Sequence, residues 1–206
     1  MEIYIDKNIK IRTIEEKDRT EFLSLFNSED FGCVGLNEEF KPSLSEENRV
    51  LTKIIDKEDI GHEILVIEDS GEFKGYISVD RPREYIYHIG HIAIKQDERK
   101  KGYGRLLIDT VKALANQEEC DITLECLKSG RFFQKMGFDG DRIELCYTYK
   151  EEDSSINLNN KPHRIFVDYK VISEERNKQL EAEREKEIKS YQKFLDSPLA
   201  KSFLNK

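Results

Sequence analysis

The 206-residue sequence predicts an α+β fold with a mixed, mostly antiparallel central sheet flanked by helices. Three strand-like segments, at residues 62–69, 74–81 and 85–95, follow one another with only turn signals between them, which is typical of an antiparallel meander. The third segment leads into an apolar helical stripe from residue 102 to about 115, and then into a buried strand at 121–127. A strand, a helix and a strand in this order predict one parallel pair. The sheet is therefore expected to be mixed.

One or two strands and two helices are predicted before this meander. The stretch "IYIDKNIKIRTI" alternates and is rich in β-branched residues, which favours strands. Thr13 and Glu16 have the spacing of a capping box, which predicts a helix from there to about residue 27. Residues 28–44 predict a loop, and 45–56 predict a second short helix.

The remainder of the chain predicts a short helix, two more strands and a charged tail. The segment "SGRFFQKM" reads as a helix that ends at Gly137, the residue type that usually follows a helix. Strands are expected at 142–150 and 163–172. From residue 173 onward the charges alternate in sign, which is typical of a solvated helix. We therefore expect one domain at 1–172 and a charged helical extension at 173–206.

Composition argues against several classes of protein. Apolar and charged residues each make up 37% of the chain, and no run approaches the roughly eighteen apolar residues of a membrane span. The N-terminus lacks the basic and apolar blocks of a signal peptide. The four cysteines show no C-x-x-C spacing, so we expect no metal site and a reduced, cytoplasmic chain. A net charge of −8 without a broad basic face disfavours nucleic acid as a partner.

The stretch "QDERKKGYGRLLID" (96–109) places a G-x-G between basic residues and a helix start. Backbone N–H groups and the helix dipole make such a turn a cradle for an anion. A P-loop is excluded because G-x-x-x-x-G-K-[ST] is absent, and a dinucleotide fingerprint because Leu107 stands at its third glycine. Two interpretations stay open: a simple turn with a helix cap, or R-x-x-G-x-G over 99–104.

The segment "HIAIKQDERKKGYGRLLID" resembles the coenzyme A motif of the GNAT acyltransferase superfamily. "IKIRTIEEKDRTEFLSLF" is similar to the family's opening strand and first helix, and "FFQKMGF" to its F-Y-x-x-x-G-F segment. The resemblance spans roughly residues 8–140, and the two later strands would complete the family's sheet. It implies a GNAT-like fold and an N-acetyltransferase that uses acetyl-CoA as its co-substrate.

The resemblance also implies where acetyl-CoA binds. The pyrophosphate would lie on the loop N–H groups, which Arg99 shapes, and the pantetheine would pair with the strand backbone like an added strand. Two positions depart from the family: Cys126 stands where Asn is frequent, and Phe133 where many members carry a general-acid Tyr. A covalent role for Cys126 is disfavoured against that of a small buried hydrophobe. Tyr147 and Tyr149 are alternative acids. The expected cofactor-binding residues are Ile92, Ile94, Arg99, Lys100, Lys101, Gly102, Tyr103, Gly104, Arg105, Cys126 and Phe133.

Direct transfer to an amine needs a base, because an ammonium of pKa ~10.4 is only about one part in a thousand deprotonated at neutral pH. His88 is the candidate catalytic residue, since some family members carry a Glu or His base on this strand. Strict alternation would place it on the same face as Ile92 and Ile94. The alternatives are His91, predicted on the opposite face, and Glu84 or Asp80 acting through water.

The charge pattern favours a cationic amine acceptor. Residues 15–69 carry sixteen Asp or Glu against six Lys or Arg, and the resemblance implies that the acceptor enters beneath the first two helices. A solvated acidic surface explains the same pattern. The main alternative function is a GNAT-fold sensor or interaction module that binds acyl-CoA with weakened catalysis. A further expectation is that the tail docks a partner or forms a homodimer.

Overall fold

The structure is a computed structural model, and it describes residues 1–28, 43–125, 130–140, 144–149, 156 and 165–196. The chain divides into two compact units, Met1–Val167 and Asp168–Lys206. The first unit contains the sheet and the candidate site. Whether the domain boundary lies at 172, as the sequence predicts, stays a prediction.

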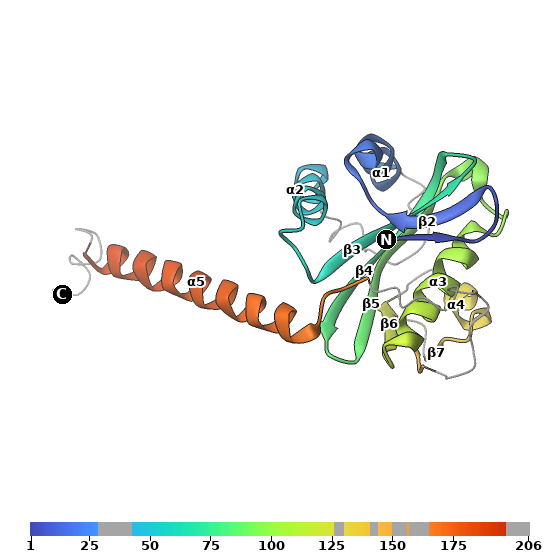
Figure 1. Ribbon diagram of the computed structural model, residues 1–206. Coiled ribbons are helices and arrows are strands. Elements are labelled where there is room, and N and C mark those ends of the chain that lie inside the picture. Colours follow the sequence, from blue (N-terminus) through green and yellow to red (C-terminus); the bar gives the residue numbers. More distant parts are fainter. Residues whose placement is uncertain (29–42, 126–129, 141–143, 150–155, 157–164, 197–206) are drawn as a thin grey trace. The chain divides into compact units, whose positions relative to one another are not determined.

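One sheet of eight strands forms the centre of the first unit, in the order β1-β2-β3-β4-β5-β6-β8-β7 (Figure 1). Neighbouring strands are antiparallel except β5 and β6, which are parallel, so the predicted mixed, mostly antiparallel sheet is confirmed. The parallel pair follows from the helix that connects its two strands. The strands are β1 (Glu2–Tyr4), β2 (Ile9–Thr13), β3 (His62–Asp69), β4 (Glu72–Arg83), β5 (Ile86–Ile94), β6 (Asp121–Glu125), β7 (Asp139–Gly140) and β8 (Glu144–Tyr147).

Helices cover both faces of the sheet (Figure 1). On one face, which we call the α1/α2 face, α1 (Arg19–Asn27) and α2 (Leu44–Ile55) bury apolar side chains against Tyr76 and Ala93. On the other face lie α3 (Tyr103–Gln117) and α4 (Gly130–Lys135). Burial of the two apolar stripes against one sheet stabilises this layered arrangement.

The first helix begins later than the sequence predicts. Thr13 is the last residue of β2 and pairs with Leu65, so the predicted capping box of Thr13 and Glu16 is wrong. The box instead joins Glu15 and Asp18, ahead of a 3₁₀ turn at Glu16–Asp18. Strand pairing keeps Thr13 extended, and the helix starts only after the chain has left the sheet.

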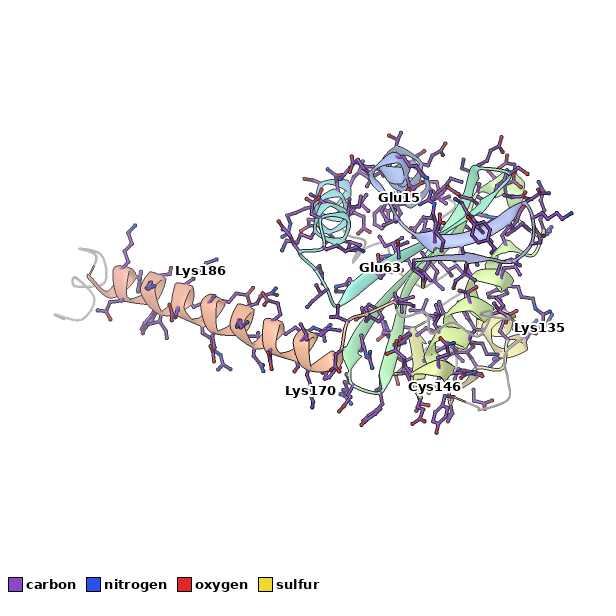
Figure 2. All side chains as sticks on the ribbon, viewed as in Figure 1. Glu15, Glu63, Lys135, Cys146, Lys170 and Lys186 are labelled. Atoms are coloured by element: carbon purple, nitrogen blue, oxygen red, sulfur yellow. The ribbon has the colours of Figure 1, made fainter. Side chains whose placement is uncertain are left out.

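The second unit contains α5 (Tyr169–Asp196). The strand predicted at 163–172 is wrong over its described residues: 165–168 form no strand, and the helix begins at Tyr169. Asp168 explains the change: its Oδ1 accepts the Lys170 N–H at 2.9 Å, and its carbonyl accepts the Ile172 N–H at 3.3 Å, which starts a helix. Side chains leave α5 on all sides, Lys186 among them (Figure 2). Within the described residues, no helix is long and apolar enough to cross a membrane.

Candidate active site

The glycine loop forms an anion cradle from backbone groups. Gly102 adopts a left-handed conformation, with φ of 97°, and Lys100 has φ of 65°. Gly102 is the N-cap residue of α3, and because it has no side chain it leaves the first N–H groups of the helix uncapped. Leu106 is the first residue whose N–H returns to Gly102, at 3.1 Å, so the N–H groups of residues 103–105 have no partner within the helix. The loop can therefore bind an anion through N–H groups and the helix dipole.

The side chains of the first helical residues turn away from this cradle. The Tyr103 hydroxyl donates to Asp69 Oδ2 at 2.5 Å, a bond that lowers the pKa of the Asp69 carboxyl. The Arg105 Nε lies 3.5 Å from Asp109 Oδ2. The Tyr103 side chain therefore ties the start of α3 to β3, and Arg105 pairs within α3, while the N–H groups of both residues stay available to a ligand.

Two cations brace the loop before the helix. The Arg99 Nε donates to the Ile94 carbonyl at 3.2 Å, which ties the loop to the end of β5. The Lys101 Nζ lies 2.6 Å from Glu98 Oε2. The predicted shaping role of Arg99 has this geometric support.

Strand β5 separates from β6 close to the cradle. Their pairing runs from Ile86 with Asp121 to Ile89 with Leu124, and residues 91–94 pair only with β4 among the described strands. The free edge of β5 can accept an extended ligand as an added strand.

The open edge and the cradle adjoin each other. A Cβ built on Gly104 would lie 3.7 Å from Ile94, 4.0 Å from Ile92 and 3.8 Å from Phe132. Phe132 was not among the predicted site residues, and its position next to Phe133 in "FFQKMGF" was the available signal. Phe133 itself is fully buried against Phe138, and its cofactor role stays a prediction. Cys126 lies outside the described residues.

The two tyrosines named as alternative acids differ in position. Tyr147 is buried, and its hydroxyl lies 3.5 Å from the Asn116 side chain of α3. It pairs with Ile122, which puts it on the sheet face opposite to Thr123. Tyr149 is exposed beyond β8.

A β-bulge at Gly90 reverses the predicted orientation of His88, whereas His91 lies opposite to Ile92 and Ile94 as predicted. Ser78 pairs with His91 while the next residue, Val79, pairs with Ile89, so Gly90 is the extra residue of β5. His88 and His91 therefore point to the same face, the α1/α2 face, and His88 does not share a face with Ile92. The prediction from strict alternation was wrong because the bulge breaks the period of two. A Cβ at Gly90 would lie 2.9 Å from the Ser78 hydroxyl, which favours glycine there.

His88 is held in a defined orientation by Thr123 of β6. The His88 Nδ1 and Thr123 Oγ1 lie 3.0 Å apart, and the Thr123 hydroxyl donates to the Tyr87 carbonyl at 3.5 Å. When the hydroxyl donates its one hydrogen to this carbonyl, its oxygen can accept an Nδ1–H from His88. Nε2 then carries the lone pair and can accept a proton.

Other titratable side chains lie on the same face. Burial, then the nearby His62 and His88, lower the pKa of His91 to about 4, so this ring is neutral at pH 7. Asp80 pairs with His88 across β4 and β5, and its Oδ2 lies 3.9 Å from His62 Nε2. Glu84 contributes its carbonyl to Arg81, at 2.8 Å from Nη2.

Glu47 is the residue of this face that the sequence analysis missed. It lies on the buried stripe of α2 together with Leu51 and Ile54. Burial raises the pKa of its carboxyl to about 7. The sequence signal was its spacing. Glu47 lies four and seven positions before the apolar Leu51 and Ile54, which places it on the inward face of the helix.

A cavity of about 460 Å³ opens between α1 and the loop that leads to α3. Arg99 links this cavity to the cradle. No group of three or more His, Cys, Asp or Glu among the described residues could hold a metal ion. The cavity is lined by Glu21, Ser24, Leu25, Ser28, Lys95, Gln96, Asp97 and Arg99.

An anion cradle beside the free edge of a splayed parallel pair is suited to an extended ligand that carries a phosphate group. The model of the acetyltransferase (GNAT) family matches residues 21–138, more than half of the chain, and the chain belongs to this family. It is an N-acetyltransferase, and acetyl-CoA is its co-substrate.

Solved structures share this fold at low sequence identity. Spermidine N-acetyltransferase from Vibrio cholerae is 15% identical, with a TM-score of 0.55 over 69% of this chain and 95% of that chain. A ribosomal α-N-protein acetyltransferase in complex with coenzyme A is 10% identical, with a TM-score of 0.58 over 74% and 100%. PaiA N-acetyltransferase from Thermoplasma acidophilum, also with coenzyme A, is 17% identical, with a TM-score of 0.54 over 68% and 99%. No curated protein sequence matches the chain.

Proposed function

We propose that this enzyme transfers the acetyl group of acetyl-CoA directly to the amine of a cationic acceptor, with His88 as the general base. One observation carries the proposal. His88 pairs with Thr123 just before the point where β5 leaves β6, so its ring lies at the closed end of the split that would receive the pantetheine. The ring faces α1 and α2, beneath which the acceptor would bind.

The proposed step needs no covalent enzyme intermediate. The His88 Nε2 takes a proton from the ammonium, the neutral nitrogen attacks the thioester carbon, and the C–N bond forms as the C–S bond breaks. Coenzyme A leaves as a thiolate, and the second proton lost by the nitrogen passes through solvent to this thiolate, so the products are the amide and the coenzyme A thiol. The His88 imidazolium then releases the first proton to solvent. A thiol with an ordinary pKa of about 8.5 is an adequate leaving group near neutral pH, so Phe133 in place of an acid does not prevent transfer.

The cationic acceptor is supported by charge. Residues 15–69, which include both helices of the α1/α2 face, are strongly acidic, and one of these acids, Glu47, lies on the buried side of α2. One structural neighbour acts on spermidine, a polyamine. The homodimer and the cytoplasmic location also stay predictions; one neighbour is described as dodecameric.

Thiol release with a panel of amines tests the base and the acceptor class. We expect release to depend on the amine and kcat to fall roughly 10²–10⁴-fold in His88→Ala, while the affinity for acetyl-CoA is retained. The matched control is Thr20→Ala on the exposed side of α1, which should change neither quantity. Faster turnover of neutral or acidic amines than of cationic ones would contradict the acceptor class.

The alternative function is that of an acyl-CoA sensor. The absence of a hydroxyl at Phe133 favours it. Tight binding of acetyl-CoA in calorimetry, without thiol release from any amine in the panel, would support the sensor and exclude the proposed transfer.

A further inference from the structure

Two carboxylates border the anion cradle, although their charge is the wrong sign for an anion site. Asp69 is the last residue of β3, and Glu98 ends the 3₁₀ turn at Gln96–Glu98 before the glycine loop. A hydrogen bond from Tyr103 lowers the pKa of Asp69, and one from Lys101 lowers the pKa of Glu98, so both are ionised at neutral pH. Negative charges near a bound pyrophosphate weaken its binding by Coulomb repulsion. A second role has to offset this cost.

Both carboxylates join the cradle to the β3–β4 hairpin. The hydroxyl of Tyr103, the first residue of α3, donates to Asp69 Oδ2 at 2.5 Å. Glu98 accepts hydrogen bonds from Lys74 of β4 at 3.0 Å and from Lys101 of the loop at 2.6 Å. The side chains of Lys74 and Glu98 are both only 12% exposed, so this ion pair is well shielded from solvent. The loop is therefore attached to one hairpin at two points.

The two attachments flank the strained part of the loop. Lys100 has φ of 65°, a left-handed conformation that costs free energy in any residue with a side chain. Such a conformation persists only where the surrounding structure holds it. Lys100 and the left-handed Gly102 both lie between Glu98 and Tyr103. A site that is ordered before binding does not lose affinity to the cost of ordering it.

We propose that Asp69 and Glu98 are positioning residues for acetyl-CoA, which hold the cradle against the β3–β4 hairpin in its binding conformation. Neither carboxylate is a ligand of the phosphates. Loss of an attachment lowers the fraction of the protein whose cradle is competent to bind, and the Kd rises by the same factor. This inference rests on the binding of acetyl-CoA at the cradle, and it depends neither on the acceptor nor on His88.

The direction of the change in Kd tests the proposal. Calorimetry measures the Kd of the full chain for coenzyme A at neutral pH. Asp69→Asn and Glu98→Gln each remove a negative charge near the anion, so electrostatics alone would lower the Kd. We expect the Kd to rise instead, by about two- to fivefold, because an amide accepts weaker hydrogen bonds than a carboxylate. Tyr103→Phe leaves the charge unchanged and removes the bond, and should raise the Kd about tenfold.

Two matched controls separate positioning from charge and from stability. Asp97→Asn removes the same charge from the exposed neighbour of Glu98, and should leave the Kd unchanged or lower it. Tyr87→Phe removes a bond of the same kind at the other end of α3, where the Tyr87 hydroxyl donates to Glu118 Oε1 at 2.9 Å. This variant should lower the thermal midpoint and leave the Kd unchanged.

Amide hydrogen exchange without ligand reports on the loop itself. The Leu106 N–H donates to the Gly102 carbonyl and is the first hydrogen bond of α3. It should exchange faster in Tyr103→Phe than in wild type, and at the wild-type rate in Tyr87→Phe.

Three results would overturn the proposal: a lower Kd in Asp69→Asn and Glu98→Gln, a Kd in Tyr103→Phe equal to that of wild type, or the same rise in Tyr87→Phe. Gly104→Ala, measured in parallel, distinguishes a failure of the cradle. If that variant alone raises the Kd, the cradle stands and the positioning role is rejected; if none of the variants does, both are rejected. Wild-type thiol release in His88→Ala would reject the proposed base and leave the positioning role intact.

Discussion

Burial raises the pKa of the Glu47 carboxyl to about 7, and the nearby His62 counteracts part of this shift. In the unfolded chain the same carboxyl titrates near its ordinary value of 4.5. Between these pH values the folded protein binds more protons than the unfolded one, so the free energy of unfolding falls as pH rises. Above about pH 7 the loss is complete.

Glu47→Gln should remove this pH dependence. We expect the glutamine variant to gain roughly 1–3 kcal/mol relative to wild type between pH 4.5 and pH 8, since each pKa unit corresponds to about 1.4 kcal/mol. Urea denaturation at both pH values measures the difference, with Glu46→Gln as the exposed control. A difference between the two proteins that stays constant across this range would show that Glu47 is not titrating in the folded state.

The residues of the site differed in how readily the sequence revealed them. His88 could be chosen as a candidate because its position on a predicted strand, shortly before the glycine loop, can be read directly from the sequence. Glu47 is harder to recognise: its spacing before Leu51 and Ile54 places it on the apolar stripe of α2, but only the packing of α2 on the sheet shows that it is buried. Burial of a side chain depends on the element that packs against it, and the sequence of α2 alone does not show which element that is.

Strand β5 shows that the bounds of an element can be predicted from local sequence, whereas its register cannot. The strand was predicted at 85–95 and is found at Ile86–Ile94, so its existence and bounds follow from local pattern. The bulge at Gly90 does not, because it depends on the register that β5 adopts against Ser78 and Val79 of β4. One inserted residue moved His88 to the other face.

The start of α3 allows a test that separates stability from ligand binding. In Gly104→Ala, the new methyl group meets its nearest neighbours at 3.7–4.0 Å, which is ordinary contact, and alanine is the better helix former by up to about 1 kcal/mol. We therefore expect equal or greater thermal stability. The same methyl narrows the space between the cradle and Phe132, so the Kd for acetyl-CoA should rise at least tenfold in calorimetry.

The matched glycine variant is Gly71→Ala in the β3–β4 hairpin. Gly71 has φ of 82° and nothing within 4 Å of an added Cβ, so alanine is strained there without touching a neighbour. It should lower stability by about 1 kcal/mol and leave the Kd unchanged. An unchanged Kd in Gly104→Ala would mean that the glycines only turn the chain.

At the scale of the whole molecule, the described site residues all belong to the unit Met1–Val167. We expect a chain of residues 1–172 to fold and to bind acetyl-CoA with the affinity of the full protein. Loss of cooperative unfolding or a weaker Kd in the shortened chain would contradict this boundary. Calorimetry and thermal denaturation of both chains make the comparison.

The helix α5 carries apolar side chains that are more than half exposed, among them Leu180, Ile188 and Tyr191. Exposed apolar groups of this size favour contact with another surface. If the tail forms the homodimer, sedimentation should show concentration-dependent association for the full chain and a monomer for residues 1–172. A monomer in both cases would exclude that role.

The sequence by itself predicted the order of the elements from β2 to β6 and the position of the glycine loop, because each depends on residues that are neighbours along the chain. The role of His88 stays a prediction. The late start of α1, the helix in place of the last strand, the face of His88 and the burial of Glu47 were decided only in the tertiary structure. Strand register, a bulge and the packing of a helix on a sheet arise from contacts between residues far apart in sequence. Local pattern does not contain those contacts.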